Sequence, residues 1–239
     1  DPRVQSENNL TINNQECMEA IEIVNEIGNF RAHNERSLPK LLPGVNFVYG
    51  LKGQTEKTFK ANYNFLEKVY NKGLSLRRIN LRQVSTHPGT DIHEFGTELV
   101  RKHKSLFKKY KRKIREEIDN PMLKRVAPEG TIIKNCYTEF HDGNKTFARP
   151  LGSYPLLIGL MEYYELGEKI DVSIVDYGFR SVTGVKYPLN INEARLKELK
   201  SIPGIGDKRA GNIIVKRPYD SLKEFKEAFD LEIDEYITT

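Results

Sequence analysis

The sequence predicts a mixed fold in three parts: an α/β part at residues 1–127, a small β-barrel at 128–188 and an all-α tail at 189–239. The spacing of apolar residues predicts this division. In the first part helical and strand periods alternate, in the second part short apolar strands lie between glycines, and in the third part the period is helical. A chain of 239 residues, 38% of them hydrophobic, can form one large domain or two to three small ones.

The first part alternates helices with apolar strands. The expected elements are, in order, a helix at 14–27, a strand at 45–49, a helix at 55–71, a strand at 76–84 and a long helix at 94–118, with Pro121 beyond it. Because a helix separates the two strands, they should form a right-handed parallel unit.

After residue 130 the pattern changes to short strands with regular turns. They are expected at 131–140, 146–149, 155–160, 169–175 and 179–185, and a turn at 142–144 joins the first two. Several short strands in this arrangement are typical of a small antiparallel barrel. From Asn192 to Thr239 the period is helical again.

Within the tail, residues 199–214 read Leu-Lys-Ser-Ile-Pro-Gly-Ile-Gly-Asp-Lys-Arg-Ala-Gly-Asn-Ile-Ile. Gly204 and Gly206 permit backbone conformations that a side chain forbids. Their N–H groups, at the start of a helix from Asp207, form a donor site for an anion. An ordinary helical hairpin with a glycine turn explains the same pattern.

The string resembles the helix-hairpin-helix motif of nucleic-acid-binding proteins. That resemblance implies contacts with a phosphate backbone from Gly204, Ile205, Gly206, Lys208, Arg209 and Lys216. Such hairpins usually occur in pairs, and 231–236 lacks the glycines of a second one. Some members use the hairpin for protein contacts, so a scaffold role stays open.

Residues 44–56 read Gly-Val-Asn-Phe-Val-Tyr-Gly-Leu-Lys-Gly-Gln-Thr-Glu, a strand that ends in a glycine loop before a helix. Parallel α/β folds place ligands at such loops, although many carry glycines only for packing. The run resembles the fifth-strand segment of radical S-adenosylmethionine enzymes, with Lys52 where proline is usual. The resemblance implies that Tyr49, Gly50 and Gly53 contact the adenine of S-adenosylmethionine.

The next strand has one polar and one apolar face. Its period of two places Arg78, Asn80 and Arg82 opposite Ile79 and Leu81. Helices should cover the apolar face, so the polar face should point towards substrate, where the arginines could bind a carboxylate or phosphate. Structural ion pairs or a solvated open sheet explain it equally well. The turn His-Pro-Gly-Thr at 87–90 resembles the turn after the sixth strand of the same enzymes, and no catalytic residue is identified.

Members of that family hold a 4Fe-4S cluster on three cysteines spaced Cys-x3-Cys-x2-Cys. This chain has only Cys17 and Cys136, and His141 has no partner at ligand spacing, so no metal ligands are predicted. The resemblance therefore implies that 1–127 is the C-terminal part of a (β/α) TIM-like barrel. Two strands alone would leave sheet edges bare, so the other strands and the cluster should come from outside this chain.

Segments 146–155 and 169–184 resemble, less closely, the small β-barrel of radical enzymes that modify transfer RNA. Aromatic residues near Arg149 and Arg180 could stack on RNA, and a purely structural barrel explains them almost as well. A second polar feature is 101–115, which contains no acid. It is either a solvated helix face or a nucleic-acid contact, and Glu116 and Glu117 could pair with its last turn.

Together these patterns predict the C-terminal portion of a radical S-adenosylmethionine enzyme that acts on, or is anchored to, nucleic acid, for example in RNA modification by methylation or methylthiolation. S-adenosylmethionine and a 4Fe-4S cluster are expected for the complete protein, with the cluster not bound by this chain alone. The alternatives are a non-catalytic nucleic-acid-binding protein and a protein-interaction scaffold. Two cysteines, a net charge of +5 and no bilayer-spanning run suit a cytoplasmic protein that could bind nucleic acid.

Overall fold

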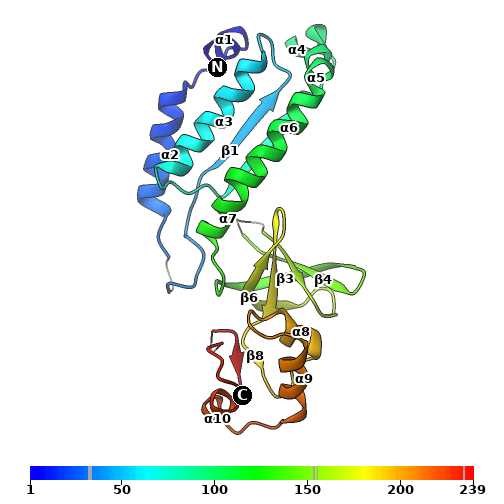
Figure 1. Cartoon of the computed structure of the whole chain (residues 1–239). Coiled ribbons are helices and arrows are strands. Elements are labelled where there is room, and N and C mark those ends of the chain that lie inside the picture. The colour runs from blue at the N-terminus through cyan, green and yellow to red at the C-terminus, as the bar shows by residue number, and fades with distance from the viewer. Residues whose placement is uncertain (32–33, 153, 155, 234) are drawn as a thin grey trace. The chain divides into compact units, whose positions relative to one another are not determined.

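A computed structural model describes the chain except residues 32–33, 153, 155 and 234. Pro155, the predicted start of the third barrel strand, lies outside the described residues. The chain divides into two compact units, the N-terminal unit (1–30 with 39–126) and the C-terminal unit (31–38 with 127–239) (Figure 1). The division after 126 is next to the boundary predicted after 127, whereas the barrel and the tail fall in one unit.

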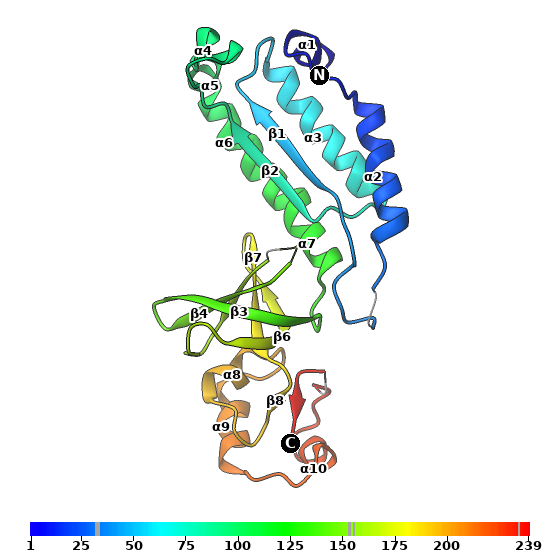
Figure 2. The same cartoon turned by 180° about the vertical axis from the view of Figure 1, so that it is seen from behind.

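The N-terminal unit contains a two-stranded parallel sheet. Its first elements are α1 (Pro2–Glu7), α2 (Asn14–Gly28), β1 (Gly44–Tyr49), α3 (Glu56–Asn71) and β2 (Arg78–Gln83). The parallel pairing predicted for the two strands is confirmed, and it runs from Gly44 opposite Arg78 to Tyr49 opposite Gln83. Figure 2 shows both strands in front of α3 and α6, so these helices cover one face of the sheet.

The long helix predicted at 94–118 is confirmed in part, because most of this range is helical but is divided into several helices that continue to Val126. The structure has α4 (Asp91–Phe95), α5 (Glu98–Lys102), α6 (Lys104–Ile114), the π-helical turn η1 (Arg115–Asp119) and α7 (Asn120–Val126). Gly96, with a φ of +71°, ends α4. Pro121 does not end the helix, because the wider π turn, in which the Asn120 N–H bonds to the Arg115 carbonyl, accommodates a residue that has no N–H to donate.

The predicted small barrel is confirmed as a closed five-stranded β-barrel. Its strands are β3 (Ile132–Asp142), β4 (Lys145–Pro150), β5 (Leu157–Leu160), β6 (Lys169–Tyr177) and β7 (Ser181–Lys186), in the order β3-β4-β5-β7-β6. The prediction that it is antiparallel throughout is wrong, because β5 and β7 run parallel. Directions cannot alternate around a closed ring with an odd number of strands, so one parallel pair is unavoidable.

The C-terminal tail packs against the barrel through a shared core. It comprises β8 (Leu189–Asn190), α8 (Leu196–Ser201), α9 (Asp207–Val215), α10 (Leu222–Phe229) and β9 (Ile237–Thr238). Barrel residues Val175 and Val185 join Leu199, Ile213 and Phe225 of the tail in one buried cluster. The tail is not all-α as predicted, because β8 and β9 form a short parallel pair that ties the end of the chain to the segment after the barrel.

Candidate nucleic-acid interface

Two short helices meet at the turn formed by residues 203–206. Gly204 has a φ of +85°, which favours glycine, whereas Gly206 is extended with a φ of −85° and is the N-cap of α9. The side chains of Ile202 and Ile205 are buried, with 1% and 3% exposed. The sequence folds this way because the isoleucines anchor the turn in the core, which leaves the backbone of both glycines at the surface.

The N-terminus of α9 is open to an approaching anion. The first N–H groups of a helix have no acceptor within it, and Gly206 has no side chain that could cap them. A Cβ at Gly206 would meet no atom within 4 Å. Together with the positive end of the helix dipole, this geometry can bind a phosphate oxygen.

The structure brings five of the six predicted hairpin residues to this turn. Lys208 is exposed beside it, and the Arg209 guanidinium donates to the Gly204 carbonyl at 2.8 Å. Ile205 can take part only through its backbone, because its side chain is buried. Lys216 is about 15 Å along the helix from Gly206, and its ammonium lies 5.2 Å from the centre of the Phe229 ring.

The outer face of the barrel carries an aromatic pair of exposed Phe140 and half-buried Phe147, and Phe147 lies in the segment 146–155 whose aromatic residues were predicted to stack on RNA. The rings of Phe140 and Phe147, opposite each other on β3 and β4, stack with centroids 4.9 Å apart. Strand alternation could have placed them on one face, but the register between the strands is not visible in the sequence. Arg149, predicted to contact RNA, forms an ion pair with Glu139, in which its Nε donates to both carboxylate oxygens at 3.1 Å.

The residues implied for adenine binding lie at the end of β1 and are occupied by contacts within the chain. The Tyr49 ring, 2% exposed, stacks on Phe59 at 4.8 Å and burial raises its pKa. A Cβ on Gly50 would lie 2.3 Å from Val100, and one on Gly53 would lie 2.9 Å from the Glu7 carboxyl. The packing of these positions is thus explained by contacts within the N-terminal unit, and adenine binding by them stays a prediction.

The polar face predicted for β2 is on the uncovered side of the sheet. Arg78 and Arg82 are exposed, Asn80 is half-buried, and Ile79 and Leu81 are buried towards the helices. The amide of Asn80 donates to the Asn46 side chain of β1 at 2.7 Å. Both arginines are thus available to an anionic group.

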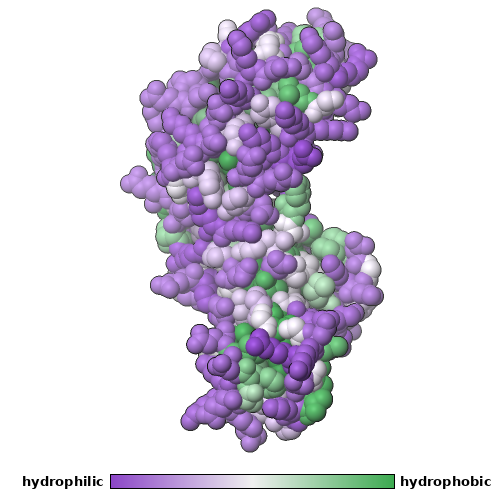
Figure 3. All heavy atoms as spheres, in the orientation of Figure 1, coloured by the Kyte–Doolittle hydropathy of each residue, from purple (hydrophilic) through white to green (hydrophobic). Residues whose placement is uncertain are grey.

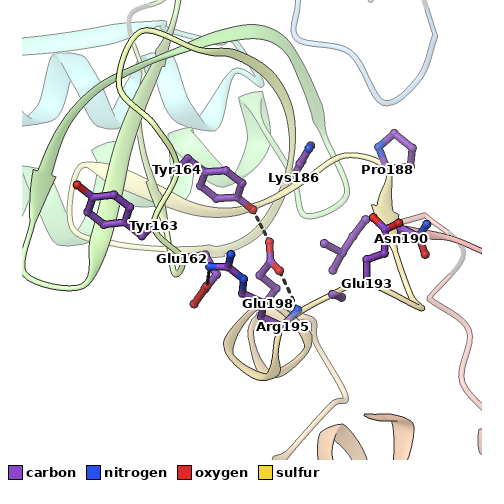
Figure 4. A pocket seen from close by; sticks show the side chains of 11 residues that line it. Glu162, Tyr163, Tyr164, Lys186, Pro188, Asn190, Glu193, Arg195 and Glu198 are labelled. Atoms are coloured by element: carbon purple, nitrogen blue, oxygen red, sulfur yellow. Dashed lines mark hydrogen bonds and ion pairs between the residues drawn. The ribbon is translucent and has the colours of Figure 1, made fainter. Parts of the chain in front are cut away.

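A cavity of about 290 Å³ lies within the C-terminal unit, between the loop after β5 and the tail (Figure 4). Tyr164 donates a hydrogen bond to Glu198, and Arg195 forms an ion pair with Glu162 at 2.7 Å. Burial, and then the hydrogen bond to Glu198, raises the pKa of Tyr164. These contacts fix α8, and with it the turn, on the barrel. Local sequence patterns do not reveal these contacts, because the partners are 33 and 34 residues apart.

The described residues contain no group of three or more His, Cys, Asp or Glu side chains that could hold a metal ion. The His141 ring stacks on Tyr163 at 3.9 Å and its Nε2 lies 2.9 Å from the Tyr164 carbonyl, which fits a structural role. Cys136 is buried, and burial, followed by the charge of Asp171, raises its pKa to about 12. A thiol with this pKa is a poor metal ligand near neutral pH.

No family model matches the chain. It is 42% identical to an uncharacterized protein of Archaeoglobus fulgidus over 226 residues, which are 95% of this chain and 42% of that protein. It is 45% identical to an uncharacterized protein of Methanocaldococcus jannaschii over 186 residues, which are 77% of this chain and 34% of that protein. The chain thus spans less than half the length of these relatives. In the described ranges, no helix has the length and apolar character needed to cross a membrane.

Proposed function

We propose that this chain anchors a nucleic acid by its phosphate backbone, through the turn at 203–206 that resembles a helix-hairpin-helix motif. The observation that carries the proposal is the open N-terminus of α9, where an uncapped helix begins behind a two-glycine turn. Exposed Lys208 adds charge at the same place. The small barrel, which shares a core with the tail, supplies a second surface on which RNA bases could stack.

The sequence resemblance places this binding part in a radical S-adenosylmethionine enzyme of the cytoplasm, with 1–127 as the C-terminal part of its TIM-like barrel. When bound, the cluster and S-adenosylmethionine would supply a one-electron reduction that generates a radical. The cluster ligands lie outside this chain on this proposal, and no step is assigned to Tyr49, Gly50 or Gly53. Arg78 and Arg82 would face an anionic group of the substrate.

Gly206→Val tests the anchoring proposal with little effect on the fold. The added side chain enters open space and the backbone there is extended, so the loss of stability should stay near or below about 1 kcal/mol. It would cover the N–H groups of α9. Charge-assisted hydrogen bonds contribute roughly 1.5–3 kcal/mol, so affinity for a short DNA duplex and for a transfer-RNA transcript should fall about 10- to 100-fold.

Gly211→Ala, more than one turn beyond the first N–H groups of the same helix, is the matched control. A Cβ there also meets no atom within 4 Å, and binding should equal that of the parent. Parent affinity for Gly206→Val, measured by fluorescence anisotropy, would refute the anchoring proposal and favour a scaffold that binds protein.

A non-catalytic nucleic-acid-binding protein is the second candidate, and it shares the anchoring step. The radical-enzyme proposal is tested separately by adding iron and sulfide to the purified chain. A stable four-iron chromophore on this chain alone would contradict the placement of the cluster elsewhere, because only two cysteines are present.

A further inference from the structure

The positive charge of this protein is concentrated away from the hairpin. Residues 101–115 carry nine Lys and Arg side chains and no acid, in a chain with a net charge of +5. Residues 128–239, which contain the barrel and the tail, have 15 Lys and Arg against 18 Asp and Glu. Since attraction of a polyanion needs a local excess of positive charge, the tail alone supplies little of it.

The helix α6 presents this charge to solvent along one face. Lys104, Lys108 and Arg112 are exposed and occur at intervals of four residues, so they follow one another on successive turns. On the opposite side of the helix, Phe107 is 8% exposed and Ile114 is fully buried. Figure 3 shows mainly hydrophilic residues on the visible face of the N-terminal unit.

Two other cations of the segment are neutralised within the chain, whereas Arg101, Lys102, Lys109 and Lys111 are exposed like the three on this face. Arg115, 2% exposed, pairs with Asp119 and donates to the Ile79 carbonyl at 2.9 Å. Lys113 lies 3.8 Å from a Glu117 oxygen and over the Tyr63 ring. By contrast, no ion pair between described residues involves Lys104, Lys108 or Arg112.

We propose that Lys104, Lys108 and Arg112 form a second contact for nucleic acid, which binds the sugar-phosphate backbone independently of the hairpin. The class of partner rests on the function proposed above. Residues four apart on a helix rise about 6 Å, so cations on successive turns can each reach a different phosphate of a polyanion. Contacts of this kind bind any sequence and are weakened by salt.

A membrane surface is the other polyanion to consider, and the packing of α6 argues against it. A helix that lies on a bilayer inserts its apolar face between the lipids. The apolar face of α6 is used inside the unit, where the Phe107 ring lies 5.2 Å from that of Tyr49. Only cations and Ser105 are exposed on the outer face between 104 and 112.

The test replaces the three cations together, as Lys104→Gln, Lys108→Gln and Arg112→Gln, in the whole chain. The matched control is Lys57→Gln, Lys60→Gln and Lys68→Gln, which removes the same charge from exposed positions of α3. A short DNA duplex is the probe, with anisotropy measured between about 50 and 200 mM salt. Each lost phosphate contact reduces the magnitude of the negative slope of log K against log salt by about 0.9, so that of the α6 variant should fall by about 2 to 3 units and that of the control by less than one.

Equal losses in the two triple variants would overturn the proposal, because they would reflect net charge alone. It would also be overturned if the α6 substitutions abolished binding to vesicles of anionic lipid and left duplex binding unchanged. The charge-conserving variant with Lys104→Arg, Lys108→Arg and Arg112→Lys should bind the duplex as the parent does. Gly206→Val is measured with the same DNA duplex. Refutation of the hairpin contact can therefore be distinguished from refutation of the α6 contact.

Discussion

Gly50 offers a direct test of whether the loop after β1 is shaped by packing or by a ligand. Gly50 has a φ of +101°, and a Cβ there would lie 2.3 Å from a methyl group of Val100. For Gly50→Ala the backbone strain should cost about 1–2 kcal/mol and the overpacking about 1–3 kcal/mol. The N-terminal unit should therefore lose about 2–5 kcal/mol of unfolding free energy.

The double variant Gly50→Ala with Val100→Ala separates the two causes. Val100→Ala removes the colliding methyl group but leaves the strain, so the two substitutions should show a coupling energy of about 1–3 kcal/mol. Urea unfolding followed by circular dichroism gives the free energies, and hydrogen exchange of peptides covering 44–55 assigns them to this unit. Additive losses, or a neutral Gly50→Ala, would refute the packing argument and return Gly50 to the role of a ligand contact.

The remaining predictions concern the two cysteines and Tyr164. Ellman's reagent should react with one thiol of the native chain, half-buried Cys17, and with Cys136 only after unfolding. Because burial raises the pKa of Cys136 to about 12, its contribution to stability is complete below about 8.5, the unfolded value, and is lost as pH rises towards 12. Cys136→Ala should flatten that alkaline decline, and an unchanged pH slope would contradict the assignment. Tyr164→Phe removes the donor to buried Glu198 and should lower the unfolding free energy by about 1–3 kcal/mol, which thermal unfolding can measure. A neutral Tyr164→Phe would mean that this contact does not hold α8 on the barrel.

Local periodicity was enough to predict most individual elements and the two faces of β2, because the side-chain period of a strand is set by its own backbone. Periodicity failed where the structure of a segment depends on residues that are distant in the sequence. The burial of Arg115 cannot be read from a run of cations, since its partners are the Ile79 carbonyl and Asp119 across a π turn. The parallel pair β5–β7 follows from closure of the ring, which no single strand encodes.

For the candidate sites, too, local features could be predicted from the sequence, whereas contacts between distant residues could not. Gly204 of the hairpin could be predicted because its tight turn needs a positive φ locally, whereas Gly50 and Gly53 fit the same pattern for a different reason. Their missing side chains make room for Val100 and Glu7, residues 50 and 46 positions away. Likewise, the exposed stack of Phe140 on Phe147 depends on a bulge that shifts the register between Thr138 and Phe140.

The most direct test of nucleic-acid anchoring is the salt dependence of duplex binding by the parent chain and by the variant that combines Gly206→Val with the three α6 substitutions. We expect a slope of log K against log salt of about −3 or steeper for the parent, since three cations of α6 and the hairpin each contact phosphate. For the combined variant we expect a slope about 2 to 3 units shallower, since Lys208 and the other exposed cations remain. A parent that binds without salt dependence, or a combined variant with the parent's slope, would contradict nucleic-acid anchoring.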